Sequence, residues 1–439
     1  MSHTADRSAA DPTVIRVGEP TWRSIHFPDP ADPTEAPLAR ANQLGRAADA
    51  AWLTSQLGLP FASLVQTTDA TTLSHTRSVA GLVPSIDPER ELTELLTWRG
   101  VAPGQAKVVR DGAFADASGF LEPAGTSSTA RSRTRVGQVA SLLDDGWSLV
   151  FDGIELRNPV TGRVAEAFER IYGCTVNVNG YLSLRANTSF GTHWDDQEVV
   201  ILQLIGAKDW EVRKPLALSM AKEAYGRVTS DEPMWKGRLE VGDALYIPRG
   251  WGHHVTGFDR LTYHQTITVP SLNGLHVTAG IMSMLADPDD PAGLEAMPGV
   301  DLGRGATIPL APPELGDQPV AGLDGSAVDR LVRRVQAGRR LSIAPRSYQR
   351  LSALLDVLEA GSTDVVVRCP CPGGWVIDRV EDDRVVAGMG GRQVAIVGDA
   401  LDVVAALTDG VPHPMPEAGR AADIARDLLR VGLLDATPR

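Results

Sequence analysis

Alternating apolar and polar residues predict a β-rich region at the centre of the chain, between about residues 175 and 269. Within it, a Gly-Asp turn precedes the run Ala244–Ile247, and the sequence Pro-Arg-Gly ends that run. Successive side chains of a strand point to opposite faces, so this alternation is typical of a short strand. Just before the region, the mostly apolar run Trp147–Phe151 predicts a buried strand.

The segments on both sides of this region have apolar residues at the three- and four-residue spacing of amphipathic helices. Before the strands, helices are expected at residues 41–60, 91–98, 136–143 and 163–172. After the strands, helices are expected at residues 271–285, 326–337, 348–360, 399–407 and 421–432. Further strands are expected at residues 364–368, 374–378, 384–387 and 393–397. Residues 286–326, which are rich in Asp, Pro and Gly, are typical of a linker.

These patterns divide the chain of 439 residues, a length that suits two or three domains, into four parts. Residues 1–145 form an N-terminal helical region that leads into the strands, and residues 146–270 form the β-rich part. Residues 271–345 form a helical linker region, and residues 346–439 form a mixed α/β tail.

Cysteine usage and charge narrow the class of protein. The three cysteines, Cys174, Cys369 and Cys371, lack the spacing of a disulfide framework, so a reducing, cytoplasmic location is expected. The formal net charge of −13 argues against nucleic acid as a partner. No apolar run reaches transmembrane length, and residues 1–20 lack the apolar segment of a signal peptide, so we expect no membrane partner.

The stretch His193-Trp194-Asp195, with a further histidine at His253, predicts a metal site. Two imidazoles and one carboxylate can hold Fe(II) on one face and leave the opposite face open for a cosubstrate and dioxygen. On a strand, residues two apart point to the same side, so His193 and Asp195 are expected to face inward while Trp194 points away.

The sequence around His253 supports its choice as the third ligand. Residues 242–253 have the pattern G-D-x4-P-x-G-x2-H, which is the second sequence motif of cupin barrels, and His253 would begin the next strand. His254 is a rival, but an adjacent residue on a strand faces the opposite side. His264 is a third candidate, although a barrel histidine that is only hydrogen-bonded is the commoner case.

The run from His193 to Trp210 resembles the JmjC-type cupin oxygenases that hydroxylate ribosomal proteins. The similarity lies in H-x-D-D-x-E-V, then I-L-Q-L, then G-x-K-x-W. The resemblance implies a mainly β, double-stranded β-helix (cupin/JmjC) barrel with flanking helices. It also implies that His193, Asp195 and His253 coordinate Fe(II), and that 2-oxoglutarate chelates the same metal as cosubstrate.

The family register assigns further residues to 2-oxoglutarate. Lys208 stands fifteen positions after His193, where the family has the basic residue for the distal carboxylate. Tyr181 and Thr268 are expected to donate hydrogen bonds to the cosubstrate. Asn179 and Ser183, which alternate with Tyr181 in an N-x-Y-x-S pattern, complete the expected set.

The resemblance implies an Fe(II)- and 2-oxoglutarate-dependent hydroxylase that acts on a side chain of a protein or peptide, either ribosomal or a biosynthetic precursor. Two alternatives stay open: an N-methyl-lysine demethylase with the same iron chemistry, and a non-catalytic metal-binding cupin that serves as an interaction module. The region after residue 271 is similar in order to the dimerisation helices and winged-helix domain of the family, which implies a homodimer. Residues 60–140 depart from the family pattern, in the part that shapes the substrate entrance.

Overall fold

The computed structural model describes two compact units. Unit 1 comprises Met1–Thr21, Ala50–Phe168 and Val176–Ser271, and unit 2 comprises Trp22–Asp49, Glu169–Thr175 and Leu272–Arg439. The described residues are 13–16, 31–59, 72–77, 82–102, 104–124, 131–172, 175–195, 197–215, 230–270, 348–370, 374–381, 384–389 and 392–439.

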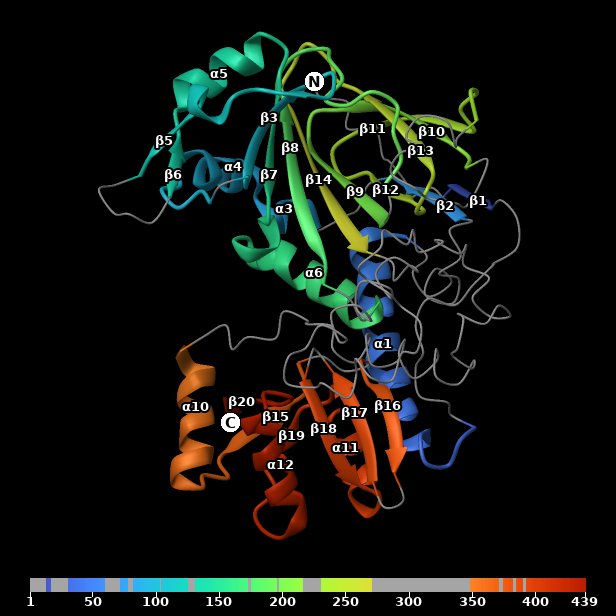
Figure 1. Cartoon of the computed structure of the whole chain (residues 1–439), viewed down its shortest axis with the longest axis vertical. Helices are drawn as coiled ribbons and strands as arrows, with labels where there is room; N and C mark the ends of the chain where they lie inside the picture. Colours follow the sequence, from blue (N-terminus) through green and yellow to red (C-terminus); the bar gives the residue numbers. More distant parts are fainter. Residues whose placement is uncertain are drawn as a thin grey trace, which may run out of the picture. The chain divides into compact units, whose positions relative to one another are not determined.

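A nine-stranded antiparallel sheet forms the larger wall of unit 1 (Figure 1). Its strands, in spatial order, are β1 (Thr13–Arg16), β2 (Thr72–Thr76), β12 (Ala244–Ile247), β9 (Gln197–Ile205), β14 (Thr262–Pro270), β8 (Asn177–Ser183), β7 (Ser148–Asp152), β3 (Ala106–Arg110) and β4 (Ala113–Phe114). Strand β9, which is buried along almost its whole length, lies between β12 and β14. A strand with so few exposed residues needs cover on both faces of the sheet.

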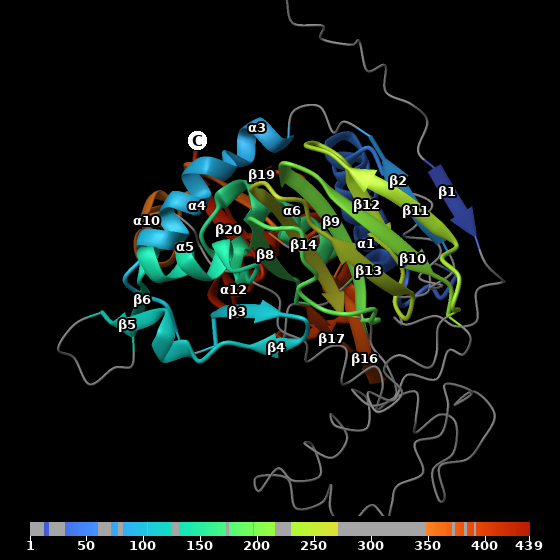
Figure 2. The same cartoon turned by 90° about the horizontal axis from the view of Figure 1, so that it is seen from above.

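The second wall of unit 1 is a three-stranded sheet (Figure 2). Its order is β11 (Trp235–Leu239), β10 (Lys208–Arg213) and β13 (Gly252–Thr256). Apolar side chains of both sheets form one buried cluster, in which Val199 and Ile201 of β9 join Trp210 and Val212 of β10. Removal of these side chains from water holds the two sheets face to face as a barrel.

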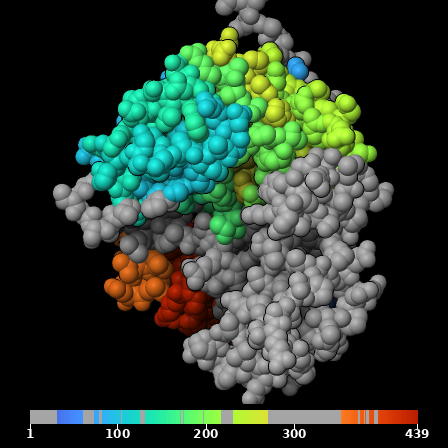
Figure 3. Space-filling model, turned by 45° about the horizontal axis from the view of Figure 1, so that its top comes forward, coloured from blue at the N-terminus to red at the C-terminus, as the bar shows by residue number. Residues whose placement is uncertain are grey.

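Helices cover the other face of the large sheet. They are α3 (Leu82–Ile86), α4 (Pro88–Thr97) and α6 (Pro159–Tyr172), while α5 (Val136–Asp144) leads into β7. Helix α4 begins three residues before the predicted helix at 91–98, because the Asp87 side chain accepts the backbone N–H of Arg90 and Pro88 occupies the first turn. In Figure 3 the cyan and teal atoms of this N-terminal part lie beside the green and yellow atoms of later residues of unit 1.

A buried carboxylate joins these helices to the sheet. Glu91 of α4 accepts hydrogen bonds from the Tyr263 hydroxyl (2.6 Å) and from Gln265 Nε2 (2.8 Å), both on β14. Asn158 Nδ2, just before α6, donates to the other carboxylate oxygen at 2.6 Å. Since Tyr263 and Gln265 point toward the helices, their neighbour His264 points into the barrel.

Unit 2 contains α1 (Ala36–Leu57, as far as Asp49), the mixed tail, and a core of its own. The tail consists of α10 (Tyr348–Ala360), β15 (Val365–Arg368), β16 (Val376–Glu381), β17 (Arg384–Met389), β18 (Arg392–Val397), α11 (Leu401–Leu407), β19 (His413–Pro414), α12 (Arg420–Arg430) and β20 (Asp435–Pro438). The strands form two three-stranded antiparallel sheets, β19-β15-β20 and β16-β17-β18.

Helix α1 belongs to this core through a reciprocal polar contact. Asn42 Nδ2 donates to the Trp375 carbonyl at 2.8 Å, and Trp375 N–H donates to Asn42 Oδ1 at 2.9 Å. The Trp375 side chain is fully buried, and its Nε1 donates to Thr408 Oγ1. An N-terminal segment thus completes the packing of the C-terminal tail.

Several elements lie where the sequence pattern predicts them, including α10 at 348–360 and strands β17 and β18. The expected helices at 271–285 and 326–337, with the linker between them, lie outside the described residues. The proposed dimerisation region, 271–345, lies there as well, and the winged-helix-like character of the tail stays a prediction. None of the helices among the described residues is both long and apolar enough to cross a membrane.

The sequence pattern predicts a helical N-terminal region and does not predict strands β2, β3 and β4. The sequence of β2, Thr-Leu-Ser-His-Thr, has a single apolar side chain, so its pattern does not mark a strand. It becomes one because its backbone pairs with β1 on one side and with β12 on the other. Tertiary pairing here outweighs local preference.

We predict that Glu91→Leu lowers the free energy of unfolding by about 2–4 kcal/mol, because it leaves buried donors of Tyr263, Gln265 and Asn158 without their acceptor. Urea denaturation would measure the change. Glu91→Gln keeps an acceptor oxygen and should lose less, and Glu94→Gln, on the exposed side of the same helix, should change stability by under about 0.5 kcal/mol. Equal stability of Glu91→Leu and the wild type would contradict this account.

Candidate active site

Two backbone hydrogen bonds pair His193 with His253. His193 N–H donates to the His253 carbonyl at 3.1 Å, and His253 N–H donates to the His193 carbonyl at 2.7 Å, which makes an isolated antiparallel bridge. The two imidazole rings lie 4.3 Å apart between centroids. Residues directly opposite each other on paired backbones bring their side chains together, so this bridge sets the spacing of the two rings.

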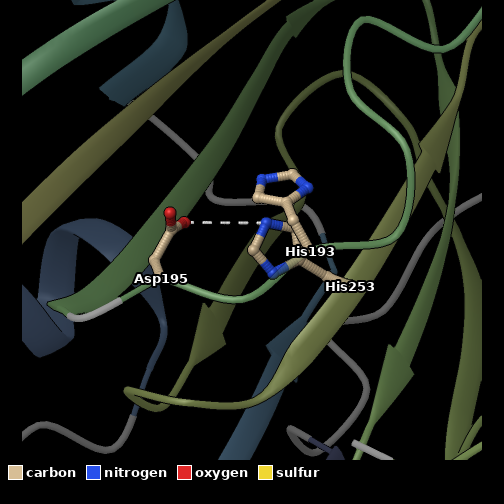
Figure 4. A group of neighbouring side chains, drawn as sticks. All are labelled: His193, Asp195 and His253. Carbon is tan, nitrogen blue, oxygen red and sulfur yellow. Dashed lines mark ion pairs between the residues drawn. The ribbon is translucent and has the colours of Figure 1, made fainter. Parts of the chain in front are cut away.

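Asp195 completes a group of three possible metal ligands. Its Oδ2 lies 3.6 Å from His253 Nε2, and the ligand atoms of all three residues lie within 4.8 Å of one another (Figure 4). The Asp195 carbonyl accepts the N–H of Gly250, which ties the segment after His193 to the turn before β13. The structure therefore brings together the three residues that the sequence predicts as metal ligands.

The local backbone differs from the sequence prediction. His193 and Asp195 were expected on one strand, but β9 begins only at Gln197, and His193 pairs solely through the bridge to His253. Trp194 lies between the two ligands and is 1% exposed, so it anchors the segment in the core. His253 lies near the start of β13, as predicted, and Val255 of that strand lines the cavity.

The second nitrogen of each imidazole faces a backbone carbonyl. His193 Nδ1 lies 2.8 Å from the Gly191 carbonyl, and His253 Nδ1 lies 3.3 Å from the Trp251 carbonyl. A proton on Nδ1 leaves the Nε2 lone pair free, which is the arrangement usual for histidine that binds metal. Burial, with a further contribution from His193, lowers the pKa of His253 to about 4, so this ring is neutral near pH 7.

These donors fit a transition metal. Two imidazole nitrogens and one carboxylate oxygen suit Fe(II), whereas Ca²⁺ and Mg²⁺ prefer oxygen ligands throughout. Zinc also accepts this donor set, and its affinity is generally higher than that of Fe(II). The carboxylate and both imidazoles face a cavity of about 430 Å³, which leaves space for further ligands on the metal.

Lys208 is the basic group of this cavity. It opens β10, its side chain is 2% exposed, and its Nζ donates to Ser183 Oγ at 3.3 Å. Burial lowers the pKa of Lys208 to about 7. A buried ammonium group with a single neutral acceptor is poorly compensated, so the site favours an anionic ligand.

The remaining predicted residues divide into two groups. Tyr181 and Ser183 of β8 line the cavity with Lys208. Asn179 accepts a hydrogen bond from Asn177 Nδ2 at 2.6 Å, and Thr268 is buried on β14, but neither is among the lining residues. Their roles toward 2-oxoglutarate stay predictions.

Several lining residues are missing from the predicted site. His264 and Thr266 of β14, Trp210 of β10 and Phe190 also line the cavity. His264 was considered only as a metal ligand, yet it lies outside the His193–Asp195–His253 group. Its alternation with Thr266 along β14 is the signal that would have placed both on the inner face. His254, the rival to His253, is not among the lining residues.

A hairpin from the N-terminal region forms part of the rim. Its turn, Asp111-Gly112, adopts positive φ angles of 51° and 78°, as a tight β3–β4 connection requires. The backbone N–H groups of this turn donate to the carbonyls of Thr188 and Ser189, at 3.1 and 2.9 Å. Gly112 itself lines the cavity. Residues far apart in sequence thus meet at the entrance.

An aromatic row runs from this hairpin toward the metal ligands. Phe114 of β4 is 60% exposed and packs edge-on against Phe190, with ring centroids 6.3 Å apart. Phe190 in turn lies 5.5 Å from the His193 ring. Phe114 thus gives the entrance of the cavity an exposed apolar side chain.

Comparison with known proteins agrees with this geometry. Curated relatives include two proteins named bifunctional lysine-specific demethylase and histidyl-hydroxylase NO66. The one from Caenorhabditis briggsae is 32% identical over 28% of this chain and 16% of its own length. The one from Drosophila willistoni is 32% identical over 32% of this chain and 18% of its own length. The chain thus spans less than a fifth of the length of either relative.

Among solved structures, the ribosomal oxygenase YcfD from Escherichia coli, in complex with cobalt and 2-oxoglutarate, is 17% identical. That similarity covers 87% of this chain and 99% of YcfD, with a TM-score of 0.49. The family model that matches the sequence is the JmjC domain, over residues 155–275, a range that contains the three candidate metal ligands and Lys208. The stretch of this chain that is similar to JmjC domains is thus residues 155–275.

Proposed function

We propose that this protein is an Fe(II)- and 2-oxoglutarate-dependent oxygenase that hydroxylates a side chain of a protein or peptide and releases succinate and carbon dioxide. The observation that carries the proposal is the joint presence of the His193–Asp195–His253 group and buried Lys208 in one cavity. The JmjC domain match and the names of the curated relatives support the same chemistry.

In this proposal the chain holds and orients reactants. His193, Asp195 and His253 would hold Fe(II), which when bound supplies the activation of dioxygen. Lys208 would bind the distal carboxylate of 2-oxoglutarate, and Tyr181 and Ser183 would line its binding site. A dicarboxylate gives Lys208 the negative charge that its buried site lacks.

The proposed substrate is a side chain of a folded protein or peptide. The names of the relatives refer to histidyl hydroxylation, and YcfD is described as a ribosomal oxygenase. Exposed Phe114, packed against Phe190 at the rim, supports binding of a macromolecular surface. A homodimer formed through residues 271–345, with a winged-helix-like tail and a cytoplasmic location, completes the proposal.

The relatives' name also supports an alternative, N-methyl-lysine demethylation by the same metal site. The third candidate is a non-catalytic cupin. The presence of all three possible metal ligands together with the buried lysine argues against it. The three functions predict different products from the same cavity, so they can be distinguished chemically.

The first test is anaerobic addition of Fe(II) and 2-oxoglutarate to metal-free protein. Chelation of 2-oxoglutarate by the bound metal should give a visible charge-transfer band. His193→Ala should show no band, and Lys208→Ala should need about 10- to 100-fold more 2-oxoglutarate, because it loses one charge-assisted hydrogen bond. His254→Gln, which changes the histidine outside the cavity, serves as the matched control and should retain the band. Wild-type protein that binds metal but gives no band would rule out the 2-oxoglutarate assignment.

A second prediction concerns the cost of burying Lys208. Its pKa is about 7 in the folded protein, against an ordinary value of 10.5, so the unfolded chain binds more protons between these values. In metal-free protein without 2-oxoglutarate, Lys208→Met should therefore raise the free energy of unfolding. The gain should be largest below pH 7, shrink as the pH rises and vanish above 10.5. Urea denaturation across this range would measure it, and a gain independent of pH would contradict the burial argument.

The product separates the candidate reactions. In an extract of cellular protein treated under ¹⁸O₂, hydroxylation should add one labelled oxygen to a peptide, with succinate as coproduct. Demethylation should instead remove a methyl group and release formaldehyde, and a non-catalytic module should give none of these products. Mass spectrometry would distinguish these outcomes. A parallel sample treated with His193→Ala identifies the changes that do not depend on the metal site, and these are disregarded.

A further inference from the structure

His264 occupies the cavity wall beside Lys208. It lies on β14 directly opposite Tyr181 of β8, is 4% exposed and lines the cavity. A register shift in the pairing of β14 with β9 falls between Tyr263 and His264. Such bulges re-aim side chains next to active sites, and here Tyr263 points to the helices while His264 points into the barrel.

The His264 ring is held in a fixed orientation. It stacks on Tyr181 with centroids 4.8 Å apart and planes inclined by 3°, and the edge of Trp210 packs against it at 5.6 Å. Two aromatic neighbours at these distances leave the ring little freedom to rotate. His264 therefore presents its nitrogens in a defined direction.

One nitrogen of this ring lacks a partner. Among the described residues, His264 Nδ1 is buried and makes no hydrogen bond. Buried polar atoms are almost always hydrogen-bonded, so an unpaired one in a side chain that lines a cavity points to a ligand. Neither the metal-ligand group nor the Glu91 network includes His264.

The charge around His264 defines that ligand. Burial, and then the positive charge of Lys208, lower the pKa of His264 well below its usual value, so its ring is neutral. A neutral imidazole can donate one N–H, and the ammonium of Lys208 donates up to three. The only acceptor that Lys208 has among the described side chains is Ser183 Oγ. This wall of the cavity thus has an excess of donors.

We propose that a ring N–H of His264 donates a second hydrogen bond to the distal carboxylate of 2-oxoglutarate, beside the bond from Lys208, and so selects a dicarboxylate as cosubstrate. A carboxylate has two oxygens and can accept from both groups. The inference rests on the proposed function, because it assigns a further residue to the same cosubstrate. Tyr181, which also lines the site, positions the His264 ring by stacking on it.

The test compares two ligands on full-length protein loaded with Mn(II). The first is 2-oxoglutarate, and the second is 2-oxopentanoate, which keeps the metal-chelating end but has a methyl group in place of the distal carboxylate. His264→Phe retains a stacking ring without the N–H. It should weaken 2-oxoglutarate about 10- to 100-fold, as loss of a hydrogen bond to a charged group does, and leave 2-oxopentanoate and Mn(II) affinities unchanged.

His264→Gln supplies a donor without the ring and should recover much of the 2-oxoglutarate affinity. Equal weakening of both ligands in His264→Phe would reduce His264 to a packing role, and unchanged 2-oxoglutarate binding would also overturn the proposal. Wild-type protein that binds Mn(II) but not 2-oxoglutarate would refute the proposed function itself, before any variant is compared.

A measurement on the wild-type protein avoids the risk that a variant is misfolded. In wild-type protein loaded with Zn(II), ¹⁵N NMR of the imidazoles should show one ring N–H whose resonance moves on addition of 2-oxoglutarate and stays in place with 2-oxopentanoate. His264→Gln should remove that resonance. If neither ligand moved any imidazole resonance other than those of the metal-binding histidines, the assignment would be contradicted.

Discussion

The pair of backbone hydrogen bonds between His193 and His253 is the constraint on which the site depends. His253 belongs to β13 of the three-stranded sheet, whereas His193 precedes β9 of the nine-stranded sheet, so the bridge joins the two walls of the barrel. The same contact sets the distance between the imidazoles and leaves both Nδ1 atoms facing carbonyls. Because the ligands are positioned by the main chain, the site is preorganised before any metal arrives.

The cavity also contains buried polar groups that lack a full set of hydrogen-bond partners. Lys208 is buried with one neutral acceptor, and His264 has a nitrogen with no partner among the described residues. Each such group lowers the stability of the free protein. A ligand that satisfies both regains this free energy on binding, so the destabilising effect of these two groups and the proposed affinity for a dicarboxylate have one physical origin.

The metal site is more predictable from sequence than the rest of the cavity. Short-range spacing places His193 beside Asp195, and the turn pattern before His253 marks it as a ligand, because both signals are local. Alternation along β14 groups His264 with Thr266 on one face, but which face lines the cavity depends on the register of β14 against β8 and β9, and that register is not a local signal. The Asp111-Gly112 turn is held at the rim by backbone hydrogen bonds to residues 188 and 189, and backbone hydrogen bonds leave no trace in the pattern of side chains. The strand prediction around His193 failed because its pairing is a single bridge.

The way in which the β3–β4 hairpin is attached determines which of its residues can be substituted during evolution. Its turn is fixed to the cavity wall by main-chain bonds, supplemented by one side-chain bond from Thr188 to Asp111. Main-chain bonds of this kind tolerate substitution at the neighbouring positions, so Phe114 can be replaced without disturbing the ligands of the barrel. The entrance and the candidate metal site are thus separately variable parts of one molecule. A lineage can alter what enters the cavity by changing a few residues of a hairpin, while the metal-ligand group within is inherited intact.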